Sequence, residues 1–361
     1  MHKEHVLRNF SVTLFMVAAV LMTSARASVL SDAADGLQPG EWTELQTQGY
    51  SESLLSACKG GSTIFEWANK AVWDPVNREV HFVGQGHVAC AKHIRYQEGS
   101  NSWSTAALPS GIGDFGHGYE HNAVNPLNGD IYYRSYSADK IEKYSAASKS
   151  WSVLPRIGTK TQVAGGIAYF PEADGLLYVD GDYGVYFYSN SSNSWSLVAN
   201  TTLMIDGGKP QLSTASYHNF ASYNPADKVV YFGGGNGSKN VYKFDAQRRV
   251  SQIANSPVSI GINSAITLAD PSSGKQLVFS NDGSIYAYNS QANSWSGAGT
   301  HPVMSHALDW RVATPISTHG VIMFMTWRFS SSKVLLYRYA EGGGVPIDVV
   351  SPMAPASIVI Q

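Results

Sequence analysis

The sequence is poor in charge of either sign. Charged residues make up 14% of the chain, and 25 Lys and Arg stand against 27 Asp and Glu, a formal net charge of −2. A nucleic-acid-binding chain normally carries a basic excess, so this composition argues against a nucleic-acid partner. It also argues against disorder as the main state, because 43% of the residues are hydrophobic and 12% are aromatic.

Long hydrophobic runs are scarce as well. The one apolar run, residues 11–22, lies near the N-terminus and is too short to span a bilayer comfortably. A basic start precedes it and a small-x-small site, Ala25-Arg26-Ala27, follows it. Residues 1–27 are therefore predicted to be a secretory signal peptide, with a buried or anchoring helix as the alternative. We expect a monomeric protein that is secreted or periplasmic and has no membrane partner.

Glycine, tyrosine and tryptophan, in contrast, are plentiful, with 34, 20 and 9 residues. This favours many short strands joined by tight turns. A proline-containing turn recurs at intervals of about fifty residues, the spacing of a repeat architecture. The first copies are Trp73-Asp74-Pro75 and Val124-Asn125-Pro126, and each copy is followed by a β-rich run. Further copies end at Pro171, Pro225 and Pro271, and a sixth, at residues 321–324, has lost the proline.

Two more runs complete each repeat. The third ends in an aromatic residue, and the fourth usually begins with Ser-Trp, at Trp103, Trp151, Trp195 and Trp295, with Val250 in the fourth repeat. Four-stranded units of about 40 to 50 residues are typical of a β-propeller. We expect the repeated Trp residues to pack blade against blade, because repetition follows structure more than function.

The last repeat lacks its fourth strand, and residues 41–45, around Trp42, can supply it. We therefore predict an all-β fold, a β-propeller of six four-stranded blades over residues 28–342, whose ring is closed by the N-terminal strand. Residues 343–361 are predicted to be a flexible tail. A seventh blade, within residues 51–70 or the tail, is the alternative.

In such a blade the start of the innermost strand and the turn between the second and third strands lie at one face. This face surrounds the mouth of the central channel, where several blades can contribute side chains. His121 lies five residues before its turn proline and His218 seven before its own, so both are expected to point to the same side. His87, His93 and His117 are predicted near the same mouth.

A mouth rich in His, Tyr, Arg and Asn and poor in acids favours an anionic, hydroxylated ligand. Arg can hold a carboxylate through two parallel hydrogen bonds. Neutralising the carboxylate makes the proton on the adjacent carbon more acidic, and His or Tyr can then remove it. This chemistry is the β-elimination of an anionic, uronic-acid-containing polysaccharide, and it requires no cofactor.

The Tyr119-Glu120-His121-Asn122 and Tyr217-His218-Asn219 segments, with channel-facing Arg, resemble the kelch-like propeller polysaccharide lyases, the ulvan lyases in particular. The likeness extends over residues 42–339. It implies that His121 and His218 are base and carboxylate neutraliser, that Tyr217 or Tyr183 is the acid, and that Arg311 or Arg134 clamps the carboxylate. Ulvan-lyase propellers have seven blades, whereas six are counted here. Candidate substrate-binding residues on this face are Arg134, Tyr136, Asn122, Asn219, His117, His87, Trp327 and Arg328.

Two other functions stay open. A glycoside hydrolase would need two facing carboxylates, for which Asp180 and Asp182 are available but share one turn. A non-catalytic, secreted carbohydrate-binding propeller would use the same mouth and should show similar sites on several blades.

Cysteine occurs only at Cys58 and Cys90. Both are expected near the mouth, and export makes a disulfide between them feasible, so we predict that bond. The alternative is a zinc site formed by Cys58, His87, Cys90 and His93. A structural calcium ion at acidic turns such as residues 180–182 is a further alternative.

Overall fold

The structure is a computed structural model. It describes residues 27–58, 62–87, 90–110, 112, 116–136, 139–201, 211–262, 264–302, 309–328 and 332–339. The side chains of Asp309, Trp310 and Arg328 are outside this description. The predicted signal peptide, apart from Ala27, and the predicted tail also lie outside the described residues.

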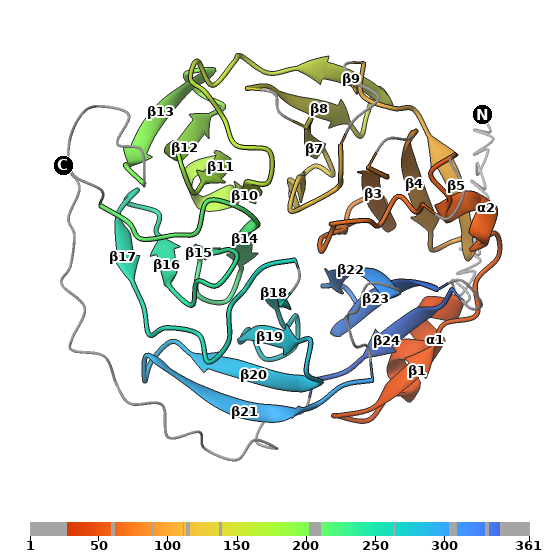
Figure 1. Ribbon diagram of the computed structural model, residues 1–361. Coiled ribbons are helices and arrows are strands. Elements are labelled where there is room, and N and C mark those ends of the chain that lie inside the picture. The colour runs from red at the N-terminus through yellow and green to blue at the C-terminus, as the bar shows by residue number, and fades with distance from the viewer. Residues whose placement is uncertain are drawn as a thin grey trace, which may run out of the picture.

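Six four-stranded antiparallel sheets form the blades of a β-propeller and surround a common centre (Figure 1). The predicted all-β propeller of six blades is thus confirmed. In blades 1 to 3 the strands, from the inside outward, are β2 (Val72–Asp74), β3 (Glu79–Gln85), β4 (Ala91–Gln97), β5 (Ser102–Ala106); β6 (Asn122–Val124), β7 (Ile131–Arg134), β8 (Ile141–Ser145), β9 (Ser150–Val153); β10 (Gly166–Phe170), β11 (Gly175–Asp180), β12 (Gly184–Ser189) and β13 (Ser194–Ala199).

Blades 4 to 6 follow the same order. Their strands are β14 (Asn219–Asn224), β15 (Val229–Gly234), β16 (Val241–Phe244), β17 (Val250–Gln252); β18 (Ala265–Ala269), β19 (Gln276–Ser280), β20 (Ser284–Asn289), β21 (Ser294–Thr300); β22 (Asp309–Ile316), β23 (Val321–Arg328), β24 (Val334–Tyr337) and β1 (Trp42–Glu44).

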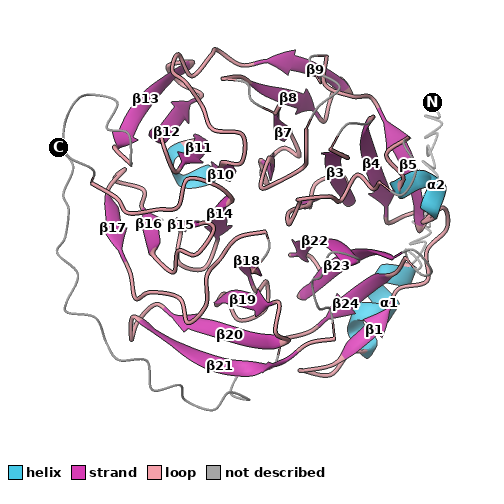
Figure 2. Cartoon of the chain, viewed as in Figure 1, coloured by secondary structure: helices cyan, strands magenta, loops and turns pink. Residues whose placement is uncertain are grey.

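The N-terminal strand closes the ring as predicted. Trp42 of β1 pairs with Tyr337 of β24, and their rings stack with centroids 4.5 Å apart. Residues 51–70 form no blade in their described part, which contains the short helix α2 (Glu52–Leu55) and isolated bridges. Helix α1 (Val29–Gly36) begins at the N-cap Ser28 and buries Leu30 and Ala34 against the core between blades 6 and 1. Figure 2 shows these helices beside a ring that is otherwise strand and loop, apart from the short 3₁₀ helix η1 (Pro171–Ala173).

Four of the recurring proline turns, those at Pro75, Pro126, Pro225 and Pro271, are capped by the residue before the proline, whereas Phe170 precedes Pro171. The Asp74 carboxylate accepts hydrogen bonds from the backbone N–H groups of Val76 and Asn77, at 2.8 and 3.1 Å. Asn224 does the same for the two residues after Pro225. A side-chain oxygen that caps the turn explains why Asp or Asn precedes the proline. All these turns lie at one face, here called the turn face, and the opposite face is the mouth face.

The repeated Trp residues are structural. Each faces a Tyr on the neighbouring strand of its own blade, with ring centroids 5.1 to 5.4 Å apart. Each indole N–H also donates a hydrogen bond to the chain that precedes the blade; Trp195, for example, reaches the carbonyl of Pro155 at 2.9 Å. These bonds tie the outer strand of one blade to the previous blade, which gives the four Trp residues a structural role.

Candidate functional site

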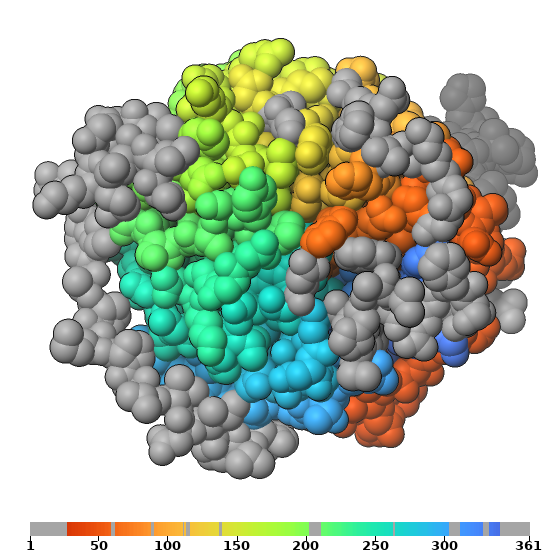
Figure 3. Space-filling view, viewed as in Figure 1, coloured from red at the N-terminus to blue at the C-terminus, as the bar shows by residue number. Residues whose placement is uncertain are grey.

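Eight aromatic side chains from five segments of the chain form a continuous cluster at the mouth face. We call this the mouth cluster. Its members are Trp67, His87, His117, Tyr119, His121, Tyr136, Tyr217 and His218. Three of the segments precede the innermost strands of blades 1, 2 and 4, whereas His87 and Tyr136 follow the second strands of blades 1 and 2. Figure 3 shows orange and green parts of the chain meeting near the centre of the ring.

Tyr119 lies at the centre of the mouth cluster. Its ring centroid is 5.0 Å from that of His121, 5.3 Å from that of His117 and 5.7 Å from that of His218. Tyr136 stacks on it at 6.3 Å with nearly parallel planes. Burial raises the pKa of the Tyr119 phenol, so it stays protonated at neutral pH. Among the described residues its hydroxyl has no hydrogen-bond partner, which leaves the proton free for a ligand.

His218 is held in one orientation by two contacts. Its Nδ1 lies 2.7 Å from Oδ1 of Asn236, and its ring stacks on the indole of Trp67 with centroids 5.6 Å apart. An amide oxygen only accepts hydrogen bonds, so the proton is on Nδ1 and Nε2 carries a lone pair. Burial lowers the pKa of His218, which favours this neutral form. Within the described chain Nε2 makes no hydrogen bond.

The turn that carries Asn236 is built from glycine. Gly233, Gly234 and Gly235 all have positive φ, at 124°, 59° and 98°, which residues with a Cβ adopt only with strain. A Cβ at Gly235 would also lie 2.6 Å from the carbonyl oxygen of Tyr217. This close approach allows the Asn236 N–H to bond the Tyr217 carbonyl at 3.0 Å and brings its side chain to His218.

His121 differs from His218 because it faces inward. It is completely buried, and its Nε2 accepts a hydrogen bond from the Arg134 guanidinium at 2.9 Å. Arg134 also donates to the carbonyls of Val163 and Gln162 and lies over the ring of Tyr178. Burial, reinforced by the Arg134 charge, lowers the pKa of His121 well below its usual range. The pair is therefore a fixed positive charge behind the mouth, and Arg134 does not reach a ligand as a clamp.

His87 and His117 form a second imidazole pair. Nδ1 of His87 lies 2.9 Å from Nε2 of His117. His87 is exposed, whereas His117 is buried, which lowers the pKa of His117 to about 4. His87 is thus the histidine of the mouth cluster that is open to solvent.

The predicted disulfide is present between Cys58 and Cys90. It holds the loop of His87, whose backbone N–H donates to Glu66. Because both sulfurs are used, the alternative zinc set of Cys58, His87, Cys90 and His93 is not assembled.

His93, predicted near the mouth, instead lies between blades 1 and 2. Its Nε2 is 2.9 Å from Nδ1 of His81, and its Nδ1 is 2.8 Å from the carbonyl oxygen of Ala107. Its ring contacts Tyr144 and Trp151. The prediction for His93 is wrong because this residue lies on β4, the third strand of its blade, away from the channel.

Two further predicted catalytic residues, Arg311 and Tyr183, make other contacts in the described structure. Arg311 of β22 donates to Oδ1 of Asn281 at 2.5 Å. Tyr183 stands in the turn after β11, where its backbone N–H bonds Asp180, and its ring is not part of the mouth cluster.

Three predicted substrate-binding side chains are used by the fold. Asn122 exchanges two hydrogen bonds with the backbone of Val83 in blade 1, at 2.9 and 3.0 Å. The amide nitrogen of Asn219 donates to the carbonyl of Ala215 at 2.9 Å. Trp327 packs in the core between blades 6 and 1. The side chain of Arg328 lies outside the described residues.

The acidic residues of the neighbouring turn are also occupied. Asp180 is fully buried and accepts from the backbone of Gln162, Asp182 and Tyr183 and from the Tyr178 hydroxyl. The Asp182 carboxylate accepts from the side chain of Gln162 at 2.6 Å. A carboxylate saturated by turn donors is a poor ligand for calcium and a poor acid–base group. Asp180 is therefore a turn residue of the fold, and the two carboxylates share one turn rather than face each other.

Three members of the site are missed by sequence reasoning: Tyr119, Trp67 and Asn236. Tyr119 stands within the motif that identifies His121, yet the motif assigns a role only to the second Tyr, Tyr217. Tyr217 is 44% exposed at the rim and touches His218 edge-on. The signal for Asn236 is the Gly-Gly-Gly-Asn turn, because three consecutive glycines indicate a close backbone approach.

Comparisons with known proteins identify no relative whose function could be assigned to this site. No family model matches the sequence, and no curated protein matches it. Among solved structures, a chain from a crystal structure of a nidogen/laminin complex matches with a TM-score of 0.44 and 12% identity, over 63% of this chain and 77% of that chain. The propeller architecture itself rests on the sheet topology. Within the described ranges, none of the helices combines the length and apolarity of a membrane span.

Proposed function

We propose that this protein is a secreted polysaccharide lyase that cleaves a uronic-acid-containing polysaccharide by β-elimination. The observation that carries the proposal is the meeting of His218 and Tyr119 in the mouth cluster. One offers an imidazole lone pair and the other a phenolic proton, and neither is engaged by the described residues. A base and an acid side by side are what an elimination requires.

In the proposed reaction Nε2 of His218 removes the proton from the carbon next to the uronate carboxyl group. The electron pair left on that carbon forms a double bond to the neighbouring carbon as the glycosidic carbon–oxygen bond breaks. The leaving oxygen takes the proton of the Tyr119 hydroxyl. A water-mediated transfer from protonated His218 back to the Tyr119 phenolate restores both groups, so no electrons or atoms remain unaccounted for.

The carboxylate must be neutralised before its neighbouring carbon becomes acidic. His87 is the exposed imidazole of the mouth cluster and can donate a hydrogen bond to the substrate carboxylate. The buried Arg134, paired with His121, adds a positive field from behind. These roles replace the direct arginine clamp expected from the sequence, and they make His121 a positioning residue.

Export is part of the proposal. It rests on the predicted signal peptide and on the Cys58–Cys90 disulfide, because such bonds persist in oxidising compartments. No metal or redox cofactor is needed for the reaction as written.

The test is a panel of uronate polymers (ulvan, alginate, glucuronan, pectate and glycosaminoglycans) followed by the ultraviolet absorbance of the unsaturated uronate product. At least one polymer should produce steadily growing absorbance, and His218→Ala should abolish it. Tyr183→Phe is the matched control, because this side chain lies outside the mouth cluster. Reducing sugar without absorbance growth would instead indicate a hydrolase, and no turnover of any polymer would contradict the proposal.

A non-catalytic carbohydrate-binding propeller is the second candidate. The observation in its favour is aromatic: Trp67, Tyr136 and the rim residue Tyr217 offer faces on which sugar rings can stack. Saturable binding of a polymer without absorbance growth, lost in Trp67→Ala but kept in His218→Ala, would support this function over the lyase.

A further inference from the structure

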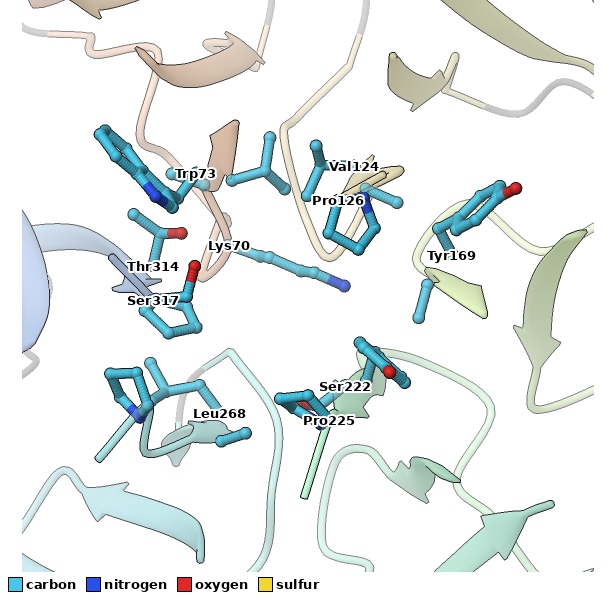
Figure 4. Close-up of a pocket in the computed structure, with 18 of the residues that line it drawn as sticks. Lys70, Trp73, Val124, Pro126, Tyr169, Ser222, Pro225, Leu268, Thr314 and Ser317 are labelled. Carbon is cyan, nitrogen blue, oxygen red and sulfur yellow. The ribbon is translucent and has the colours of Figure 1, made fainter. Parts of the chain in front are cut away.

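A cavity of about 430 Å³ lies at the turn face, at the other end of the same inner strands that begin in the mouth cluster (Figure 4). Strand β14, for example, follows His218 and ends at Asn224, and Pro225 lines the cavity. The volume lies within the range of about 300 to 1,000 Å³ that is usual for small-molecule sites. The cavity is therefore large enough for a ligand of its own, separate from the mouth.

The wall of this cavity is mainly apolar. Every blade contributes the proline at or near the end of its innermost strand: Pro75, Pro126, Pro171, Pro225, Pro271 and Pro315. Between them lie aliphatic and aromatic side chains such as Leu268, Trp73 and Tyr169. Such a wall favours an apolar body, because contact with it removes apolar surface from water.

One cation interrupts the apolar wall. Figure 4 shows the side chain of Lys70 running across the centre of the cavity. Its ammonium group donates to the carbonyls of Ile167 and Ala221, both at 2.6 Å. An ammonium has three protons, and within the described residues the third has no hydrogen-bond acceptor. Glu120 forms an ion pair with this ammonium at 3.9 Å and does not line the cavity. Glu172 does line it, and its carboxylate accepts a hydrogen bond from the Tyr223 hydroxyl at 2.9 Å.

Trp73 supplies a second donor. It lines the cavity, and its buried indole N–H has no hydrogen-bond partner among the described residues. Figure 4 shows the nitrogen on the edge of the indole that is nearer to Thr314, another lining residue. A buried donor without a partner is unfavourable, and a ligand oxygen would satisfy it. The cavity thus holds two donors with unused capacity, Lys70 and Trp73, and the first is charged.

We propose that this turn-face cavity binds a small amphipathic monocarboxylate, an acid with an aromatic or aliphatic body. The carboxylate would take the third proton of Lys70, and the body would fill the space inside the ring of prolines. The proposal does not rest on the lyase function, because it uses none of the mouth cluster.

The experiment measures binding of phenylbutyrate and of its uncharged amide to the full chain by titration calorimetry. The acid should bind with saturation and at least about tenfold more tightly than the amide, a difference of about 1.4 kcal/mol. Lys70→Met should remove that preference. Ala269→Phe should abolish binding of both compounds, because Ala269 lines the cavity and belongs to none of the hydrophobic core clusters.

Tyr217→Ala, at the mouth face, is the control and should bind the acid as the unmodified protein does. Lys70 is deeply placed, so if Lys70→Met does not fold, Ala269→Phe with an unchanged unfolding temperature carries the test. Equal affinity for acid and amide, no saturable binding of the acid, or full binding by Ala269→Phe would overturn the proposal.

Discussion

Asn236 and His218 flank the hairpin of β14 and β15, His218 just before β14 and Asn236 just after β15. Oδ1 of Asn236 lies 2.7 Å from Nδ1 of His218. The Asn236 amide oxygen fixes the imidazole tautomer of His218, and Nε2 lies on the side of the ring opposite to this bond. His218 also has a left-handed backbone, with φ of 67°. A non-glycine residue adopts that region with strain, so the surrounding contacts hold His218 in place. The pair therefore behaves as one unit in the proposed chemistry.

The first prediction concerns this orienting bond. Asn236→Leu should lower kcat by about 10- to 100-fold, the usual effect of removing a residue that orients a functional imidazole. KM should change little, since Asn236 is not proposed to touch the substrate. The ultraviolet assay on the best polymer of the panel gives both constants. Asn236→Asp keeps the acceptor and should retain more activity than the Leu variant; equal rates for Asn236→Leu and the unmodified protein would remove Asn236 from the mechanism.

The second prediction concerns the proposed acid. Tyr119→Phe deletes only the hydroxyl and keeps the ring contacts with His121, His218 and Tyr136. The loss of general acid catalysis should lower kcat by about 10²- to 10⁴-fold. The unfolding temperature should stay within a degree or two, because the hydroxyl has no partner in the described structure. Tyr136→Phe is the matched control and should be nearly as active as the parent.

The third prediction is the pH profile of kcat/KM. His218 must be neutral to act as a base, and burial lowers its pKa. The activity should therefore fall with acid only below about pH 6.5, the ordinary value for histidine. Burial raises the pKa of Tyr119, so the phenolic proton stays in place and no loss of activity is expected on the alkaline side below about pH 10. An acidic limb centred above pH 7 would contradict the assignment of His218 as base.

The architecture can be predicted from the sequence because the same local interactions recur along the chain. An Asp or Asn before the turn proline caps the turn through its side chain, as Asp74 does. The outer-strand Trp always meets an aromatic residue of the third strand, and Trp42 meets Tyr337 in the same way. The missing strand of the last blade could therefore be found at the opposite end of the chain.

The site was only partly predictable because its residues leave the strand pattern. Tyr119 and His218 have φ of 37° and 67°, and Trp67 has φ of 52°. Alternation of side chains holds only for extended backbone, so it cannot place residues in left-handed conformations. Alternation correctly predicts that His121 and His218 lie in one cluster. It cannot predict that His121 is buried and bonded to Arg134. The structural use of Asn122 likewise depends on a neighbouring blade.

The fourth prediction concerns the Cys58–Cys90 bond. The cysteines are 32 positions apart, and a crosslink of that span stabilises a fold by about 3 to 4 kcal/mol through loop closure. A Cys58→Ser, Cys90→Ser double variant should unfold at a lower temperature and become insensitive to reducing agent. Its activity should also fall, because the crosslinked segment carries His87. An unfolding temperature equal to that of the oxidised parent would show that the bond contributes nothing.

The last prediction is the loss of stability in mild acid. Burial lowers the pKa of His93 to about 3 and that of His117 to about 4. An unfolded chain binds these protons near pH 6.5, so only the unfolded state gains protons as the pH falls below about 6.5. The stabilisation from the neutral imidazoles is complete above that pH and is lost progressively towards pH 4 and then pH 3.

Denaturant titrations at several pH values test this. The free energy of unfolding should fall by several kcal/mol in total, since a tenfold difference in proton affinity between the folded and unfolded states is worth about 1.4 kcal/mol. His93→Gln removes one of the titrating groups, so its curve should be flatter between about pH 6.5 and pH 4. Above pH 7 the two curves should run parallel, because neither state takes up a proton there. Equal slopes in the acid range would mean that His93 is already charged in the folded protein.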